Sequence, residues 1–317
     1  MAVILGLIVQ GGQMFLVLAV APLLLGLTRK VKAQLLRRRG PALVQPYRDL
    51  ARLLRKEVVL AQNASWLFRV APYLIFAATW VAAALVPTFG TGLEFSWSAD
   101  LIAITALLGS ARFFLALVGM DVGTSFGGIG ASREVMFASL AEPAMIMIVF
   151  TVALLAGSTQ LSTVAAFMVA HVSLRVSLGL ALIGLIIVAL AENSRIPVDN
   201  PATHLELTML HEAMVLEYSG RHLAVIELAA ALKLLLYLSM VACIFVPWGL
   251  APEGAGPRTL TVGVLTYFAK LAVGGVLLVF FETSIAKMRV FRVPDFLGAA
   301  LMLGFLGTLL LFVSGSF

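Results

Sequence analysis

Residues 224–248 read AVIELAAALKLLLYLSMVACIFVPW, an apolar run with only two charged side chains, Glu227 and Lys233. A helix needs about 20 such residues to cross the hydrocarbon core of a bilayer. The whole chain shares this character: 61% of its 317 residues are hydrophobic and 12% are charged, against about 25% charged in soluble domains. So few polar groups could not cover a soluble protein of this length. The sequence therefore predicts an all-α, polytopic membrane protein.

We expect a single transmembrane domain over residues 1–317 with about eight transmembrane helices and one amphipathic surface helix. The first apolar run has no basic residue before it and many after it, which is the reverse of a signal peptide, so we expect it to be retained as a span. The expected spans are 3–27, 67–87, 101–120, 136–156, 161–190, 224–248, 260–282 and 296–316. The connectors expected on one side are 28–66, 120–135, 191–223 and 283–295.

The basic residues predict the orientation. Seventeen of the 22 Lys and Arg residues lie in or beside those four connectors, and the opposite connectors hold only Arg258. Because basic residues stay on the cytoplasmic side, we expect both termini to face outward from the cell inner (plasma) membrane. The net charge of +6 therefore reflects orientation, and we expect no nucleic-acid partner. The seventeen are Arg29, Lys30, Lys32, Arg37, Arg38, Arg39, Arg48, Arg52, Arg55, Lys56, Arg69, Arg133, Arg195, Arg221, Lys287, Arg289 and Arg292.

Residues 42–58 are too polar for a span. Arg48, Arg52 and Arg55 follow helical spacing, with leucines on the other side, which predicts an amphipathic helix on the inner surface. Two interpretations stay open, an orientation anchor and a docking surface for a partner.

Several charges lie inside the apolar runs, where each costs about 2.5–3.5 kcal/mol on insertion scales. Such groups normally face a bundle interior and pair with one another. Helical spacing would place His171 and Arg175 on one face. One interpretation is a proton or ion pathway across five spans, and the other is a set of salt bridges that fix helix packing. The charges are Arg112, Glu142, Arg175, Glu227, Lys233, Lys270 and Glu282.

The connector at 190–222 concentrates acids in an oily chain. Five of the 16 acidic residues lie there: Glu192, Asp199, Glu206, Glu212 and Glu217. Pro197 and Pro201 break the exit from the fifth span, and residues 203–217 read as a helix with an acidic face. The pair His204 and His211 is a weak metal candidate without further ligands. GGIG at 127–130 is expected to be a turn between spans and not a nucleotide site.

The single cysteine, Cys243, cannot hold an iron–sulfur centre or a zinc ion alone. We therefore expect no cofactor and no metal in this chain, and no catalytic residue of its own. Any redox metal would belong to a partner subunit.

The motif AExxRxPxDxP, followed by a glutamate and then EYSG, resembles the signature loop of the NADH dehydrogenase subunit 1 family of respiratory complex I. The matching residues are Glu192, Arg195, Pro197, Asp199, Pro201, Glu206 and Glu217–Gly220. The loop RRRGPALVQPYRDLARLLRKE resembles that family's first loop. It is shorter between GP and QP, and His204 replaces one acid. NPATHLELTMLHEAMVLEYSG and GASREVMFASLAEP resemble the membrane subunits of group 4 nickel–iron hydrogenases, of the formate hydrogenlyase and hydrogenase-4 type.

The resemblance implies a membrane-anchor and coupling subunit of an oxidoreductase complex. It would dock a soluble redox arm and link electron transfer to proton or sodium translocation. The implied partners are the hydrogenase large and small subunits, an iron–sulfur subunit and antiporter-like membrane subunits, with nickel–iron and iron–sulfur centres in those subunits. The alternatives are a quinone-binding subunit of NADH:quinone oxidoreductase and a passive structural anchor.

The resemblance and the charge pattern together predict two sets of functional residues, one for a proton pathway and one for docking a partner. The expected proton pathway is Glu142, Glu192, Asp199, Glu206, Glu212, Glu217, His171, Arg175, Glu227 and Lys233. The expected partner-docking residues are Arg39, Gln45, Asp49, Arg195, Pro197, Tyr218 and Arg221.

Overall fold

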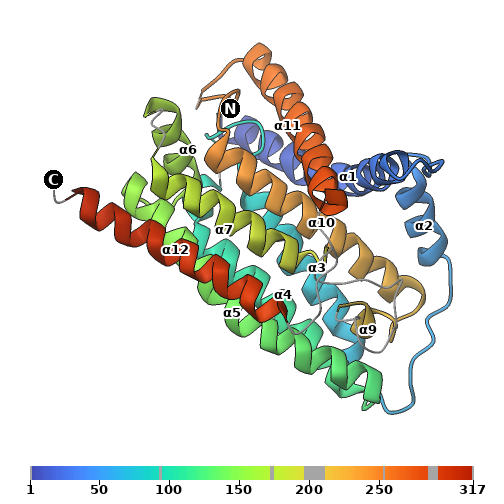
Figure 1. Ribbon diagram of the computed structural model, residues 1–317. Helices are drawn as coiled ribbons and strands as arrows, with labels where there is room; N and C mark the ends of the chain where they lie inside the picture. Colours follow the sequence, from blue (N-terminus) through green and yellow to red (C-terminus); the bar gives the residue numbers. More distant parts are fainter. Residues whose placement is uncertain are drawn as a thin grey trace.

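The computed structural model describes residues 2–92, 95–171, 175–195, 211–252, 254–284 and 292–315, and throughout these ranges the chain is built from helices (Figure 1). Within them, seven helices are long and apolar enough to cross a membrane. These are α1 (Ala2–Leu35), α3 (Trp66–Leu85), α4 (Leu101–Asp121), α5 (Ser125–Ala156), α10 (Gly220–Phe245), α11 (Pro257–Ser284) and α12 (Val293–Gly315). The prediction of an all-α polytopic membrane protein is confirmed.

The predicted fifth span is divided. The structure has α6 (Leu161–Ala170) and α7 (Val176–Glu192) where the sequence predicted one helix over 161–190, and both are shorter than the seven long spans. At 1.5 Å per residue, α7 alone is about 25 Å long. His171 and Arg175 lie between the two helices. The prediction that they share one helical face is therefore wrong.

The predicted connector 120–135 is also mostly helical. α5 begins at Ser125, and the Thr124 hydroxyl caps it by accepting from the Gly127 amide. GGIG at 127–130 is therefore the start of a helix and not a turn. Gly127 lies where α5 crosses α4: a Cβ there would meet the Gly119 carbonyl oxygen at 2.5 Å. Glycine permits this close approach.

The other connectors are shorter than predicted as well. α1 continues to Leu35, α10 begins at Gly220, and α12 begins at Val293. The amphipathic helix is α2 (Gln45–Leu54), somewhat shorter than the predicted 42–58, and it packs against α1 and α10. Arg48, Arg52 and Arg55 are exposed, and Leu50 and Leu53 are half-buried, while Leu54, the last residue of α2, is exposed. The predicted amphipathic character is confirmed.

The order of the helices places the connectors on two sides. Of the described connector residues, 36–65, 122–124, 193–195, 216–219 and 292 lie on one side, called here the basic side. Residues 86–92, 95–100, 157–160, 246–252 and 254–256 lie on the opposite side. On the opposite side, short backbone bridges join Gly90 to Ala251 and Asp100 to Gln160. The main core lies between α1, α3, α4, α5, α7 and α10. α12 packs across α5 and α7, while α11 packs beside α1 (Figure 1).

Candidate functional site: a buried chain of charges

Four helices bring four charged side chains together inside the bundle. Arg112 of α4 lies 2.9 Å from Glu134 of α5, measured from Nε to Oε1, and its Nη2 contacts Glu192 Oε1. Glu192 is the last residue of α7, and its other oxygen is 2.7 Å from Lys233 Nζ of α10. The result is an alternating chain, Glu134–Arg112–Glu192–Lys233, which we call the central cluster.

The central cluster is buried but electrically balanced. Its side chains are 6% to 16% exposed. Removing ions from water costs several kcal/mol each, and pairing repays this only where the contacts are close. Two carboxylates and two cations satisfy that condition. Neutralising any one of them leaves a neighbour without its partner, so the cluster responds to each change of charge within it.

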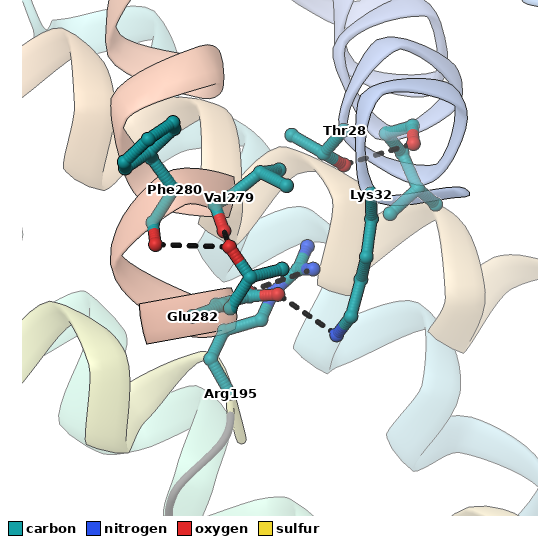
Figure 2. Close-up of polar contacts among 8 residues, drawn as sticks. Thr28, Lys32, Arg195, Val279, Phe280 and Glu282 are labelled. Carbon is teal, nitrogen blue, oxygen red and sulfur yellow. Dashed lines mark hydrogen bonds and ion pairs between the residues drawn. The ribbon is translucent and has the colours of Figure 1, made fainter. Parts of the chain in front are cut away.

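A second set of ion pairs lies on the basic side. Glu282, near the end of α11, has a fully buried side chain between two cations (Figure 2). Lys32 of α1 donates to its Oε2 at 2.9 Å, and Arg195, just beyond α7, lies 3.3 Å from its Oε1. This set carries one excess positive charge. It joins α1, α11 and the first residues of the acidic connector.

A cavity of about 350 Å³ separates the two sets of charges. Its wall includes all four residues of the central cluster and both cations that pair with Glu282. Leu25, Leu50 and Ile226 provide apolar wall. The remaining charged residues of its wall are Arg29, Asp49, Glu212 and Glu227.

The acids near this cavity differ in position. Glu212 lies on the short helix α9 (His211–Val215) and Glu227 on the first turns of α10, and both line the cavity. Burial raises the pKa of Glu212 above its ordinary value, and nearby Arg29 opposes the shift. Glu217 is directed elsewhere, because its carboxylate accepts from the Thr124 hydroxyl at the start of α5. It therefore ties the connector to the α4–α5 crossing.

Glu142 lies beyond the central cluster from this cavity. A second cavity, of about 10 Å³, is lined by Glu142, Arg112, Glu192 and Tyr237, and this is about the room that one water molecule needs. Glu142 is also exposed on the outer surface of α5. The Glu142 carboxylate thus lies between the central cluster and the outer surface of the helix bundle.

Two residues expected in the pathway lie away from it. His171 is exposed and stacks on Phe167, with ring centroids 4.6 Å apart. Arg175 is exposed at the start of α7, and Glu192 is at its far end, about 25 Å along the helix. The structure therefore does not bring His171 and Arg175 to the central cluster. Asp199 and Glu206 lie outside the described residues.

The residues expected to dock a partner are also divided. Arg39 and Arg221 are exposed on the basic side. Gln45 donates to Asp49 at 3.0 Å on α2. Arg195 is held by Glu282, and Pro197 lies outside the described residues.

Tyr218 requires a correction. Its ring is buried and stacks on Phe68 with centroids 4.1 Å apart, so it belongs to the core and not to a docking surface. Gly220 has φ +54, and a Cβ there would meet the Glu57 carbonyl oxygen at 2.4 Å. The EYSG motif thus packs tightly against residues 56–59, which are distant in the sequence.

The site contains residues that the pathway prediction omits. Arg112 and Glu282 are predicted as charges within spans but not as members of the pathway, and Glu134 is predicted to lie in a connector. The one signal for Glu134 in the sequence is the absence of proline between 122 and 142, which is compatible with one long helix. Within the described residues, no group of three or more His, Cys, Asp or Glu side chains is placed to hold a metal ion.

The fold and the buried charges define a polytopic helical membrane protein with a charge-lined cavity. The chain belongs to the NADH dehydrogenase family, whose family model matches residues 9–313. The resemblance found in the signature loop, to the complex I subunit 1 family, is therefore confirmed.

Individual relatives place the chain among membrane subunits of multisubunit complexes. Formate hydrogenlyase subunit 4 of Escherichia coli K12 is 34% identical over 296 residues, covering 93% of this chain and 95% of that protein. Hydrogenase-4 component C of the same organism is 33% identical over 280 residues, covering 88% of this chain and 86% of that protein. The similarity to both relatives therefore extends over most of each chain.

A solved structure supports the fold. A chain of the membrane-bound sulfane sulfur reductase, an archaeal respiratory membrane complex, matches with a TM-score of 0.80 at 19% identity. The match covers 98% of this chain and 99% of that one. The arrangement of helices is therefore shared over nearly the full length.

Proposed function

We propose that this chain is the membrane-anchor and coupling subunit of a complex-I-like nickel–iron hydrogenase of the formate hydrogenlyase or hydrogenase-4 type. It holds the soluble redox arm on its basic side and links electron transfer there to proton or sodium movement in the membrane. The identity of 34% over nearly the full length of formate hydrogenlyase subunit 4 supports this assignment. The nickel–iron and iron–sulfur centres belong to the partner subunits.

One observation carries the coupling role: Glu192 lies on the cavity wall with one oxygen on Arg112 and the other on Lys233. Passive packing requires charges to be paired, but it does not require them beside an internal cavity that can hold water. Buried ionisable groups that line such cavities in membrane proteins typically mark ion or proton routes. Arrival of a proton at Glu192 would weaken its hold on both cations.

The arrangement suggests a route. Glu212 and Glu227 would receive protons on the connector side of the larger cavity, and Glu192 would accept them at its inner end. A water in the smaller cavity would connect the central cluster to Glu142. Because Glu142 is exposed on α5 and a bare carboxylate in lipid is costly, an antiporter-like membrane subunit would cover it. His171 and Arg175 have no part in this route.

A second candidate function is quinone binding, as in NADH:quinone oxidoreductase. The 350 Å³ cavity favours it, because α1, α2 and α10 supply apolar side chains to its wall beside the ten charged ones, and a cavity of this size can hold a small molecule. The two functions differ in their partners. Copurification of a nickel–iron large subunit supports the first, and binding of a quinone-site inhibitor in the cavity supports the second.

Crosslinking tests the docking role. Photo-crosslinking residues at Arg39 and Arg221, both exposed on the basic side, should capture the large subunit or its iron–sulfur partner in native membranes. The same residue at Trp97, which is 72% exposed on the opposite side, is the matched control and should capture neither. Crosslinks from Arg39 and Arg221 that reach only lipid or membrane subunits would overturn the docking assignment.

A further inference from the structure

The segment Glu192–Arg195 joins the two sets of ion pairs. Glu192 belongs to the central cluster, and Arg195 belongs to the set around Glu282. Only Asn193 and Ser194 separate them. The position of one anchor therefore limits the position of the other.

The backbone between the anchors is in an uncommon conformation. Ser194 has φ +48, a left-handed value that residues with a Cβ seldom adopt. The turn is closed by backbone hydrogen bonds from Asn193 to the Ala189 carbonyl at 3.1 Å and from Arg195 to the Leu190 carbonyl at 3.0 Å. Strained turns of this kind persist where the surroundings hold them in place.

We propose that Glu192–Arg195 is a strained hinge held closed at both ends, and that Glu282 is the positioning residue of its outer end. Glu282 comes from α11 and is fully buried, so it offers Arg195 a fixed anchor (Figure 2). Release of Arg195 lets Ser194 relax. Glu192 then loses the geometry in which it bridges Arg112 and Lys233.

The hinge links the Arg195–Glu282 pair to the central cluster through four consecutive residues, Glu192–Arg195. A displacement of Arg195 acts first on its ion pair with Glu282. Glu192 lies three residues away and would follow. This property concerns how the chain holds the residues that end α7, and it can be tested whether or not ions move through the chain.

Amide hydrogen exchange in the purified, assembled complex measures the hinge directly. The amides of Asn193–Arg195 are hydrogen-bonded within the turn and should exchange slowly. Glu282→Gln should raise the exchange rate of these amides at least about tenfold, because the loss of the Arg195 ion pair lowers the free energy needed to open the turn locally. Lys32→Gln is the matched control: it removes the other cation from Glu282 but leaves the Arg195 contact, so exchange at 193–195 should stay near wild type.

Two further variants keep the inference testable. If Glu282→Gln does not assemble, Arg195→Gln should give the same rise, since it leaves Glu282 paired with Lys32. Glu192→Gln should also raise the exchange rate of these amides. The double variant Glu192→Gln/Glu282→Gln should exchange at about the rate of the faster single variant, because either substitution opens the same turn. Wild-type exchange in Glu282→Gln or Arg195→Gln would overturn the hinge, as would effects that multiply in the double variant.

Discussion

Arg112 is the residue on which the central cluster depends. Its guanidinium reaches Glu134 of α5 and Glu192 of α7 from a single position on α4. A guanidinium suits this task because its several N–H donors point in fixed directions and it stays charged when buried. Lysine, with one point of charge, could not serve both carboxylates equally well.

Replacing Arg112 should therefore be severe. Arg112→Met leaves two buried carboxylates without their shared partner, and we expect it to lower the free energy of unfolding by about 3–5 kcal/mol. The control is Arg52→Met, which breaks an exposed pair with Asp49 at 3.4 Å and should cost about 0–1 kcal/mol. Denaturant unfolding in detergent gives both values. Equal losses in the two variants would contradict the structural importance of the cluster.

Glu212 makes stability depend on pH. Its pKa is raised in the folded protein above the 4.5 of an unperturbed glutamate, so the unfolded chain ionises first as pH rises. Folding therefore loses stability as pH climbs through 4.5, and the loss is complete above the folded pKa.

Glu212→Gln should remove this loss. Its thermal midpoint in detergent should match wild type near about pH 4 and exceed it near about pH 8. Glu57→Gln, at an exposed acid on the same side, should show no such pH-dependent gain. A gain for Glu212→Gln that is larger at low pH would have the wrong sign and would refute the explanation.

At this scale the sequence was partly informative. Glu192 and Lys233 could be identified because charges in apolar runs must find partners. Which partners they find depends on helix rotation and crossing, which one sequence does not specify. Arg175 carries the same signal as Arg112 in the sequence, yet it is exposed at the start of α7 while Arg112 is buried.

The crossing of α4 and α5 sets the geometry around the cluster. Gly119 and Gly127 face each other there, and a Cβ on Gly119 would meet Met214 Cγ of α9 at 2.8 Å. Small residues allow membrane helices to approach closely. This approach brings Arg112 and Glu134, seven residues from each glycine along their helices, within contact distance.

Enlarging Gly127 should separate the two helices. Gly127→Ala places a methyl group 2.5 Å from backbone, and we expect a loss of about 1–3 kcal/mol in unfolding free energy. Gly128→Ala is the matched control, because nothing lies within 4 Å of its Cβ position. It should be neutral or slightly stabilising. If both alanines have the same effect, the close crossing is not a constraint.

Hydrophobic runs predicted that helices exist but not where each one ends. α5 begins eleven residues before its predicted apolar run at 136, because Thr124 caps it and glycines pack against α4. Those are tertiary contacts. The boundary between α6 and α7 was missed for a similar reason. Residues 161–170 and 176–191 are both apolar, so composition alone predicted one span across them.

The whole molecule has a basic and an opposite side. The asymmetry of the Lys and Arg residues predicts that the basic side is cytoplasmic. Reporter fusions after residues 60 and 210 should therefore read cytoplasmic, and fusions near 95 and 255 should read external. A single reversed connector would refute this topology.

Across the molecule, the charged residues of the proposed pathway form a spatial series that runs from the basic side into the bundle. Glu212 and Glu227 line the larger cavity, the central cluster closes its inner end, and Glu142 lies one water-sized cavity further on. Each helix of the cluster contributes one charge, so coupling would not need any helix to move far. We propose that protons move along this series of charged residues, in addition to the part that the residues play in helix packing.

Glu192→Gln and Glu142→Gln test that claim most directly. Each keeps the shape of the side chain and removes its titration. In vesicles that contain the assembled complex, hydrogenase turnover and ion translocation are measured together. We expect both variants to retain the soluble arm and catalyse electron transfer, while ions moved per turnover fall at least about tenfold. Unchanged translocation per turnover in both variants would contradict the pathway and leave the buried charges as packing contacts.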